Sequence, residues 1–208
     1  MSSPDKLIEG FRRFRKLHYI TNDSLFRKLV QGQTPKVLVV ACCDARVDPA
    51  LVLDCAPGDL FVIRNVANLV PPAENRGHYQ GTCSALEFGV RNLGIKHIIV
   101  LGHAQCGGIR ALMEDGVAKD ASFLAEWMGI ARAAREKVNR ELAGASYEVR
   151  RRACEQESVL GSLNNLMTFA WIREAVEQGE LTLYGWYFDI EHGELLGYNS
   201  ATGQFEAL

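Results

Sequence analysis

Two short motifs in the chain hold residue types that bind metals. Cys42 is followed by Asp44 and Arg46, and further along His103 is followed by Cys106 in a glycine-rich segment. Two thiolates and one imidazole form a donor set that suits zinc. A structural zinc site normally closes with four protein ligands, whereas a catalytic site has three and keeps a position for water or substrate. Cys42, His103 and Cys106 therefore indicate catalytic zinc, with one ion per subunit.

The carboxylate and guanidinium that follow Cys42 form a second chemical feature. If this segment is extended, Asp44 and Arg46 lie on the same side of it and can pair. An ordinary exposed pair of this kind contributes only ~0–1 kcal/mol. Beside a zinc ligand, however, Asp44 can accept a hydrogen bond from zinc-bound water while Arg46 keeps the carboxylate ionised and oriented. Release by Arg46 would let Asp44 coordinate zinc and close the site, with loss of activity at lower pH.

Buried strands are predicted to position these ligands. Continuous apolar runs, rich in β-branched residues, occupy 36–42, 60–64 and 97–102, as is typical of strands in a parallel sheet. Cys42 ends the first run and His103 follows the third. Because sites in open parallel sheets form outside the carboxyl ends of the strands, the two ligands are expected to meet at one edge.

The remaining pattern predicts an α/β fold. Helical spacing indicates an amphipathic N-terminal arm over about 4–18 and a helix over 79–93 that completes a β-α-β crossover. Further helices are predicted over 109–113, 121–142 and 150–178, with interruptions at Gly144 and Gly161, and a strand over 181–189 is followed by a hairpin strand that ends at Tyr198. We expect a single domain over 1–208, with a mainly parallel central sheet flanked by helices.

Composition limits the class of partner. The chain has 23 Lys and Arg against 25 Asp and Glu, a formal charge of -2, so no basic field predicts nucleic-acid binding. No apolar run approaches the roughly 20 residues that span a bilayer, and the first residues lack the basic-then-apolar pattern of a secretory signal, so we expect a cytoplasmic protein without a membrane partner. The cysteines outside the metal motifs are expected to be buried free thiols: Cys43, Cys55, Cys83 and Cys154.

Taken together, the motifs Cys42-x-Asp44-x-Arg46 and His103-x-x-Cys106-Gly-Gly resemble the zinc signature of the β-class carbonic anhydrases. The similarity continues through 32–36, 57–61, 64–72 and 185–186 and looks closest to the plant-like branch of that family. The resemblance implies the family fold and the reversible hydration of carbon dioxide to bicarbonate and a proton, by attack of zinc-bound hydroxide.

The resemblance also implies a substrate pocket. Gln33 matches a side chain that donates to bound substrate, and the backbone N–H of Gly107 matches a donor to bicarbonate. An apolar wall is implied at Phe61, Val66 and Phe88, although the plant-like pattern has tyrosine in place of Phe88. Family members form homodimers or larger even-numbered homo-oligomers, which implies pocket residues shared across the dimer and an N-terminal helix that packs on the partner subunit.

Two other functions remain compatible with the motifs. One is an enzyme of the same fold that hydrolyses carbonyl sulfide or carbon disulfide, which are nearly isosteric with carbon dioxide. The other is a noncatalytic protein that binds zinc or bicarbonate, in which Asp44 permanently fills the coordination sphere. The sequence does not assign a proton shuttle; His78 and His97 are candidates.

Overall fold

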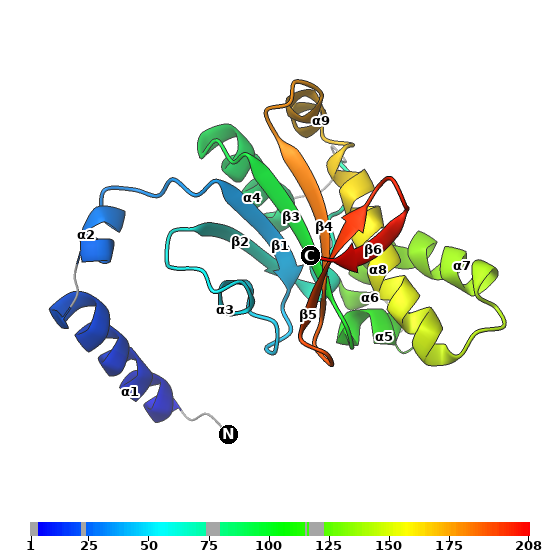
Figure 1. The fold of residues 1–208 in the computed structure, drawn as a ribbon, viewed down its shortest axis with the longest axis horizontal. Coiled ribbons are helices and arrows are strands. Elements are labelled where there is room, and N and C mark those ends of the chain that lie inside the picture. Colours follow the sequence, from blue (N-terminus) through cyan, green and yellow to red (C-terminus); the bar gives the residue numbers. More distant parts are fainter. Residues whose placement is uncertain (1–3, 22–23, 74–79, 115, 117–122) are drawn as a thin grey trace. The chain divides into compact units, whose positions relative to one another are not determined.

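The computed structural model describes residues 4–21, 24–73, 80–114, 116 and 123–208. Contacts within the chain divide it into two compact units, Met1–Thr34 and Pro35–Leu208. The first unit contains the helices α1 (Pro4–Arg15), η1 (Lys16–Thr21) and α2 (Ser24–Leu29). The second unit contains all the strands that the structure describes (Figure 1).

The predicted N-terminal helix is confirmed as α1 and the π-helix η1, which continues it. Its apolar side chains are exposed, with Leu7 at 66% and Phe11 at 60% of their full accessible area. At the end of this unit Phe14 packs against Phe26, with ring centroids 5.4 Å apart. The expected single domain over 1–208, with the arm packed on a partner subunit, stays a prediction.

A six-stranded sheet forms the centre of the second unit, in the order β2-β1-β3-β4-β5-β6. Its strands are β1 (Val37–Cys42), β2 (Leu60–Asn65), β3 (His97–His103), β4 (Thr182–Asp189), β5 (Glu194–Asn199) and β6 (Gln204–Ala207). The first four strands are parallel, and β5 and β6 are antiparallel additions at one edge. The predicted mainly parallel sheet is therefore confirmed, with β1 lying between β2 and β3.

Both faces of the central strands are buried, which explains their continuous apolar runs. On one face Leu38 and Val40 of β1 belong to a core cluster that also includes Val159 of the long helix α8 (Tyr147–Leu166). On the other face Val39 and Ala41 form a separate cluster with neighbouring strands. Because successive side chains of a strand point to opposite faces of the sheet, one apolar run contributes to the packing on both faces.

Helices cover the sheet and form its connections. Besides α8, the described helices of the second unit are α3 (Pro49–Val52), η2 (Val66–Asn68), α4 (Gly81–Glu87), η3 (Phe88–Asn92), α5 (Gly107–Met113), α6 (Phe123–Met128), η4 (Gly129–Ala131), α7 (Arg132–Glu141) and α9 (Ala170–Glu177). Helix α8 packs along β3 and β4, and α7 packs on α8 (Figure 1). Among the described helices, none has both the length and the apolar character required to cross a membrane.

Two details of the predicted elements are wrong. Gly161 does not interrupt its helix: it lies inside the 20-residue α8, where a glycine costs only ~1 kcal/mol relative to alanine. The break between helices comes instead after Leu166, where Phe169 has extended backbone and precedes α9. The sequence analysis also missed β6, which pairs with β5 and ends the sheet.

Gly102 allows α8 to approach β3 directly before His103. A Cβ atom at this position would lie 2.5 Å from Cγ2 of Val159, which is too close for van der Waals contact. Gly102→Ala is therefore expected to lower the free energy of unfolding by ~1–3 kcal/mol, the usual effect of overpacking a core. Urea unfolding measures this change.

Gly161→Ala is the matched control for that measurement. A Cβ atom at Gly161 would meet no atom within 4 Å, and the residue lies in the same helix that contacts Gly102. This substitution is expected to raise the free energy of unfolding by roughly 0.5–1 kcal/mol, because alanine favours a helix over glycine. Equal effects of the two substitutions would contradict the close approach at Gly102.

Candidate metal centre

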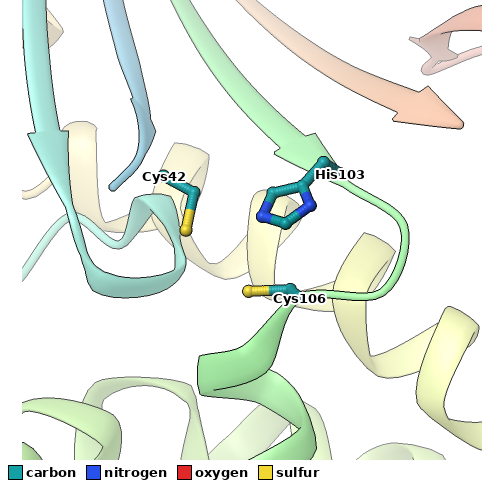
Figure 2. Close-up of side chains that lie close together, drawn as sticks. All are labelled: Cys42, His103 and Cys106. Atoms are coloured by element: carbon teal, nitrogen blue, oxygen red, sulfur yellow. The ribbon is translucent and has the colours of Figure 1, made fainter. Parts of the chain in front are cut away.

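Three potential metal ligands converge at the carboxyl edge of the sheet. Sγ of Cys42, a ring nitrogen of His103 and Sγ of Cys106 all lie within 4.8 Å of one another. All three residues are buried, with 5%, 1% and 1% of their area exposed. Figure 2 shows the side chains pointing toward one another from β1, from β3 and from the turn that precedes α5. The sequence prediction that these residues meet at one sheet edge is confirmed.

Strand pairing and a tight turn produce this convergence. Cys42 and His103 are the last residues of β1 and β3, which are adjacent parallel strands. After His103 the N–H of Ala104 donates to the carbonyl of Phe188 on β4 at 2.9 Å. Gln105 then adopts a positive φ of 61°, and the chain reverses so that Cys106 returns to the same edge.

The hydrogen bonding of His103 leaves one ring nitrogen free to bind a metal. Its Nδ1 lies 2.8 Å from the carbonyl oxygen of Ala104, and a carbonyl accepts, so Nδ1 carries the proton. In the described part of the chain, the buried Nε2 has no hydrogen-bond partner. Zinc binds a ring nitrogen that carries no proton. Because the Ala104 carbonyl holds the proton on Nδ1, Nε2 is in this state. The residues present therefore fit zinc.

The pKa values of the two thiols are shifted in opposite directions. The hydrogen bond from Cys106, together with His103 nearby, lowers the pKa of Cys42 to about 4 against the effect of burial. The same bond and burial raise the pKa of Cys106. Burial opposes the protonation of His103, yet the Cys42 thiolate raises its pKa overall. Metal binding displaces such protons, because zinc binds thiolates and neutral imidazole.

Asp44 and Arg46 form the predicted pair beside the cluster. The guanidinium donates from Nε to Oδ1 at 2.9 Å and from Nη2 to Oδ2 at 2.7 Å, and the backbone N–H of Arg46 also reaches Oδ1 at 3.0 Å. These hydrogen bonds hold the pKa of Asp44 well below its usual range. The carboxylate is therefore ionised and faces Arg46, which is consistent with a three-ligand centre.

A second arginine, which the sequence analysis did not assign to the site, secures the loop after Cys42. Arg64 on β2 donates from Nε to the carbonyl of Cys42 at 2.9 Å and from Nη2 to the carbonyl of Asp44 at 2.7 Å. Its remaining nitrogen, Nη1, pairs with Asp48 at 2.9 Å. Arg64 thus fixes the backbone of both the first ligand and the charged pair. The sequence contains no pattern from which the hydrogen bonds of Arg64 to these two carbonyls could be predicted.

Two of the predicted pocket residues lie at the same edge as the cluster. Val66 directly follows β2, and a Cβ atom on Gly108 would lie 2.9 Å from its Cγ1. Val66 is 36% exposed, so part of its side chain faces open space. Gly107 begins α5 beside Cys106, and a Cβ atom there would meet no atom within 4 Å. Both residues can therefore line a space next to the cluster.

Phe61 and Phe88, which are also predicted pocket residues, lie away from the cluster. Phe61 pairs in register with Leu38, four residues before Cys42, and therefore lies roughly 13 Å back along the strands. Phe88 packs beside it, with ring centroids 6.0 Å apart, and is 46% exposed. Gln33 is exposed in the first unit. Within one chain the structure does not bring Phe61 or Phe88 to the three ligands, and the role of Gln33 stays a prediction.

Neither candidate proton shuttle gains support from the structure. His97 is the first residue of β3, whereas His103 is the last, so the two are separated by roughly 20 Å of strand. That distance excludes direct proton exchange with the cluster in the same chain. His78 lies outside the described residues.

The remaining cysteines are free thiols, but the expectation that all four are buried is wrong. Cys154 is buried, and burial raises its pKa to about 12. Cys43 is exposed, because it follows Cys42 directly and side chains alternate along an extended segment. Cys55 and Cys83 are partly buried.

A polar network joins the metal turn to the β4–β5 hairpin. The side-chain amide of Gln105 donates to Glu191, whose N–H donates to Oδ1 of Asp189 at 3.0 Å. Asp189 is 1% exposed and pairs through Oδ2 with Arg152 at 2.7 Å and His192 at 3.0 Å. Potential ligand atoms of Asp189, Glu191 and His192 also lie within 4.8 Å of one another, but the buried carboxylate is already paired with Arg152.

Because Asp189 must be ionised to pair with Arg152, we expect the fold to lose stability in acid. Burial alone would raise the pKa of Asp189, but the hydrogen bonds from Arg152 and His192 lower it from 3.8 to about 2. A carboxyl group with a lowered folded-state pKa stabilises the fold above its unfolded pKa, and this contribution disappears as the pH falls toward about 2. Asp189→Asn is expected to cost about 2 kcal/mol at neutral pH, typical for hydrogen bonds to a charged group.

Urea unfolding of wild type and Asp189→Asn at a series of pH values tests this expectation. The stability difference between them should shrink between about pH 4 and pH 2. Glu87→Gln, which breaks the exposed pair between Glu87 and Arg91, is the control and should have little effect at any pH. A constant difference between wild type and Asp189→Asn across this range would contradict the assigned ion pair.

A buried Cys-His-Cys cluster at the carboxyl edge of a mainly parallel sheet places this protein among α/β proteins whose ligand set could hold a transition metal with one position left open. Comparison with known proteins then identifies the family. Residues 37–195 match the family model described as carbonic anhydrase, which covers most of the chain. The chain therefore belongs to the carbonic anhydrase family.

Individual relatives agree with this assignment. The chain is 39% identical over 186 residues to β carbonic anhydrase 5, chloroplastic, of Arabidopsis thaliana, a match that covers 89% of this chain and 61% of that protein. The structure of the β-carbonic anhydrase CcaA superposes with a TM-score of 0.94 at 34% identity, over 100% of both chains. A tetrameric β-carbonic anhydrase of the fungus Sordaria macrospora superposes with a TM-score of 0.76 at 29% identity, over 93% of this chain and 92% of that one.

The chain spans about three fifths of the length of the Arabidopsis relative. The name of that relative assigns it to the chloroplast, so a cytoplasmic location for this chain stays a prediction. The family, the mainly parallel α/β fold and the predicted resemblance to the plant-like branch are confirmed by these comparisons.

Proposed function

We propose that this protein is a carbonic anhydrase that hydrates carbon dioxide reversibly to bicarbonate and a proton, with one zinc ion per subunit held by Cys42, His103 and Cys106. The observation that carries the proposal is the buried Nε2 of His103, which has no hydrogen-bond partner among the described residues, in a cluster whose potential ligand atoms lie within 4.8 Å of one another. Zinc bound there would supply the Lewis acidity that makes water a nucleophile near neutral pH. Membership of the carbonic anhydrase family supports the reaction.

In this proposal Asp44 orients the reacting water and Arg46 orients Asp44. Oδ1 of Asp44 accepts from both Nε and the backbone N–H of Arg46, whereas Oδ2 accepts only from Nη2 and retains a second lone pair. Asp44 can therefore accept a hydrogen bond from the water and aim the remaining lone pair of that water at carbon dioxide. The lowered pKa of Asp44 keeps it an acceptor throughout the neutral range. Two thiolates weaken the Lewis acidity of the metal, so a nearby acceptor is useful.

The substrate is held by groups from more than one segment. Val66 supplies an apolar surface for carbon dioxide, and the N–H of Gly107 donates to the developing bicarbonate oxygen. Because Phe61 and Phe88 lie well back along the strands, we assign them, with Gln33, to the site of a second copy of the chain. This assignment requires a homodimer or a larger even-numbered oligomer, and the tetrameric relative from Sordaria macrospora supports it.

The alternatives are not favoured. Hydrolysis of carbonyl sulfide or carbon disulfide has no support from the relatives, which are described as carbonic anhydrases. A noncatalytic centre closed by Asp44 is not favoured because both oxygens of Asp44 pair with Arg46. Both remain outcomes of the functional test.

Stopped-flow hydration of carbon dioxide, with zinc quantified per subunit and the pH varied, tests the proposal. We expect hydration that scales with bound zinc. Release of sulfide from carbonyl sulfide or carbon disulfide is measured on the same sample. Faster sulfide release than hydration would identify the first alternative, and a zinc-loaded protein without hydration at alkaline pH would identify the second.

A further inference from the structure

A buried carboxylate lies directly beneath the turn that carries Cys106. Glu155 on α8 is 3% exposed, and its Oε1 accepts the backbone N–H of Cys106 at 3.1 Å. Its Oε2 accepts the hydroxyl of Tyr187 at 2.7 Å, and Tyr187 itself is fully buried. Arg151, one turn earlier on the same helix, brings Nε to 3.6 Å from Oε1. Neither the metal ligation nor the proposed reaction uses this group.

Burying a carboxylate costs free energy that its hydrogen bonds and ion pairs must offset. Burial penalises a charged carboxylate and raises the pKa of Glu155, and a buried polar group needs its hydrogen bonds satisfied. Here two donors converge from different parts of the chain, the metal turn and β4, and Arg151 of α8 adds a positive charge nearby. The carboxylate therefore connects the turn to the rigid core of the second unit.

The turn above Glu155 has a conformation that needs such support. Gln105 has a φ of 61°, in the left-handed region that residues with a side chain rarely adopt. Strained backbone persists only where the surrounding structure holds it in place. The hydrogen bond from the Cys106 N–H to Glu155 directly follows this strained residue, at the residue that carries the thiol.

We propose that Glu155 is a positioning residue of the metal centre, which holds the Cys106 backbone so that its thiolate meets Cys42 and His103 at ligand distance. The proposal rests on the proposed zinc site and adds a residue that touches neither metal nor substrate. Groups that orient metal ligands typically change metal affinity by about 10–100-fold when they are removed.

Two substitutions of Glu155 test whether it acts by accepting the hydrogen bond from Cys106 or only by filling space in the core. Glu155→Gln keeps an oxygen acceptor for the Cys106 N–H and similar volume. Glu155→Leu fills the space but leaves that N–H without a partner. Zinc affinity is measured by competition with a chromophoric chelator, and Co²⁺ is substituted to record the thiolate-to-cobalt charge-transfer absorption. We expect affinity close to wild type for Glu155→Gln, and for Glu155→Leu a loss of about 10–100-fold with an altered cobalt spectrum.

Leu166→Ala is the control for general destabilisation of α8. Leu166 is fully buried at the far end of the same helix, in the core cluster of Leu38 and Val40, so its loss weakens the fold without touching the metal turn. It should leave zinc affinity and the cobalt spectrum unchanged. Wild-type affinity in Glu155→Leu, or an equal loss in Leu166→Ala, would overturn the proposal.

Tyr187→Phe covers the case in which Glu155→Leu does not fold. It removes only the hydroxyl that donates to Oε2 and should weaken zinc binding, though less than Glu155→Leu; unchanged affinity would then count against the role of Glu155. These readouts do not depend on catalysis. If the wild-type protein binds zinc tightly but hydrates no carbon dioxide, the proposed function is wrong, and the zinc affinities of the variants still test the role of Glu155. If the wild-type protein binds no zinc, both proposals are wrong.

Discussion

Replacing Cys106 with serine is expected to abolish zinc retention and, with it, hydration of carbon dioxide. A serine hydroxyl is a far poorer zinc ligand than a thiolate, and only Cys42 and His103 would remain of the cluster. Since loss of a group that merely orients a ligand costs about 10–100-fold in affinity, loss of a ligand should exceed about 100-fold. Zinc per subunit is measured by elemental analysis after dialysis, and hydration is measured by stopped flow.

Cys43→Ser is the matched control, because Cys43 adjoins a ligand in sequence but is exposed. It should retain zinc and wild-type hydration. Both proteins are first shown by circular dichroism to be folded. Zinc retention and full activity in Cys106→Ser would refute the assignment of this cysteine as a ligand.

Replacing Asp44 with asparagine is expected to separate metal binding from catalysis. Asparagine keeps the shape of the side chain but loses the charge that pairs with Arg46 and the acceptor strength that orients water. Zinc should remain bound, because the three ligands are untouched. Hydration should fall by about 10²- to 10⁴-fold, the range typical of a positioned proton acceptor.

Asp48→Asn is the control for this substitution. Asp48 is a nearby carboxylate paired with Arg64, but it is 49% exposed and caps α3, a position that asparagine also favours. Hydration by Asp48→Asn should remain close to wild type. Equal losses in the two variants would mean that any charge change in this loop impairs the site, and the specific role of Asp44 would be wrong.

The sequence was sufficient to predict the ligand cluster because each ligand ends or follows a strongly apolar strand. Parallel strands place their carboxyl ends at one edge, and Cys42 and His103 meet there because β1 and β3 are neighbours in the sheet. The charged pair could be predicted because Asp44 and Arg46 are only two residues apart. These features are local, or follow from a general property of parallel sheets.

Features that depend on tertiary packing could not be predicted in the same way. The position of β1 between β2 and β3 depends on how strands pair across the sheet. Gly161 looked like a helix break because its local preference disfavours a helix, but packing of α8 overrides that preference. Glu155 resembles any helical glutamate in sequence, since nothing in the spacing relates it to Cys106, 49 residues away.

Arginine bonding at the sheet edge has a consequence for local unfolding. Arg46 joins the loop after β1 to the turn before α5, since it binds Asp44 and also donates to the carbonyl of Gln105 at 3.0 Å. Arg64 holds the carbonyls of Cys42 and Asp44 on that same loop. Neither segment can open to solvent without breaking the charged hydrogen bond from Arg46 to Gln105. The amide hydrogens of the two segments should therefore exchange with solvent together, as one cooperative unit, although they are far apart along the chain.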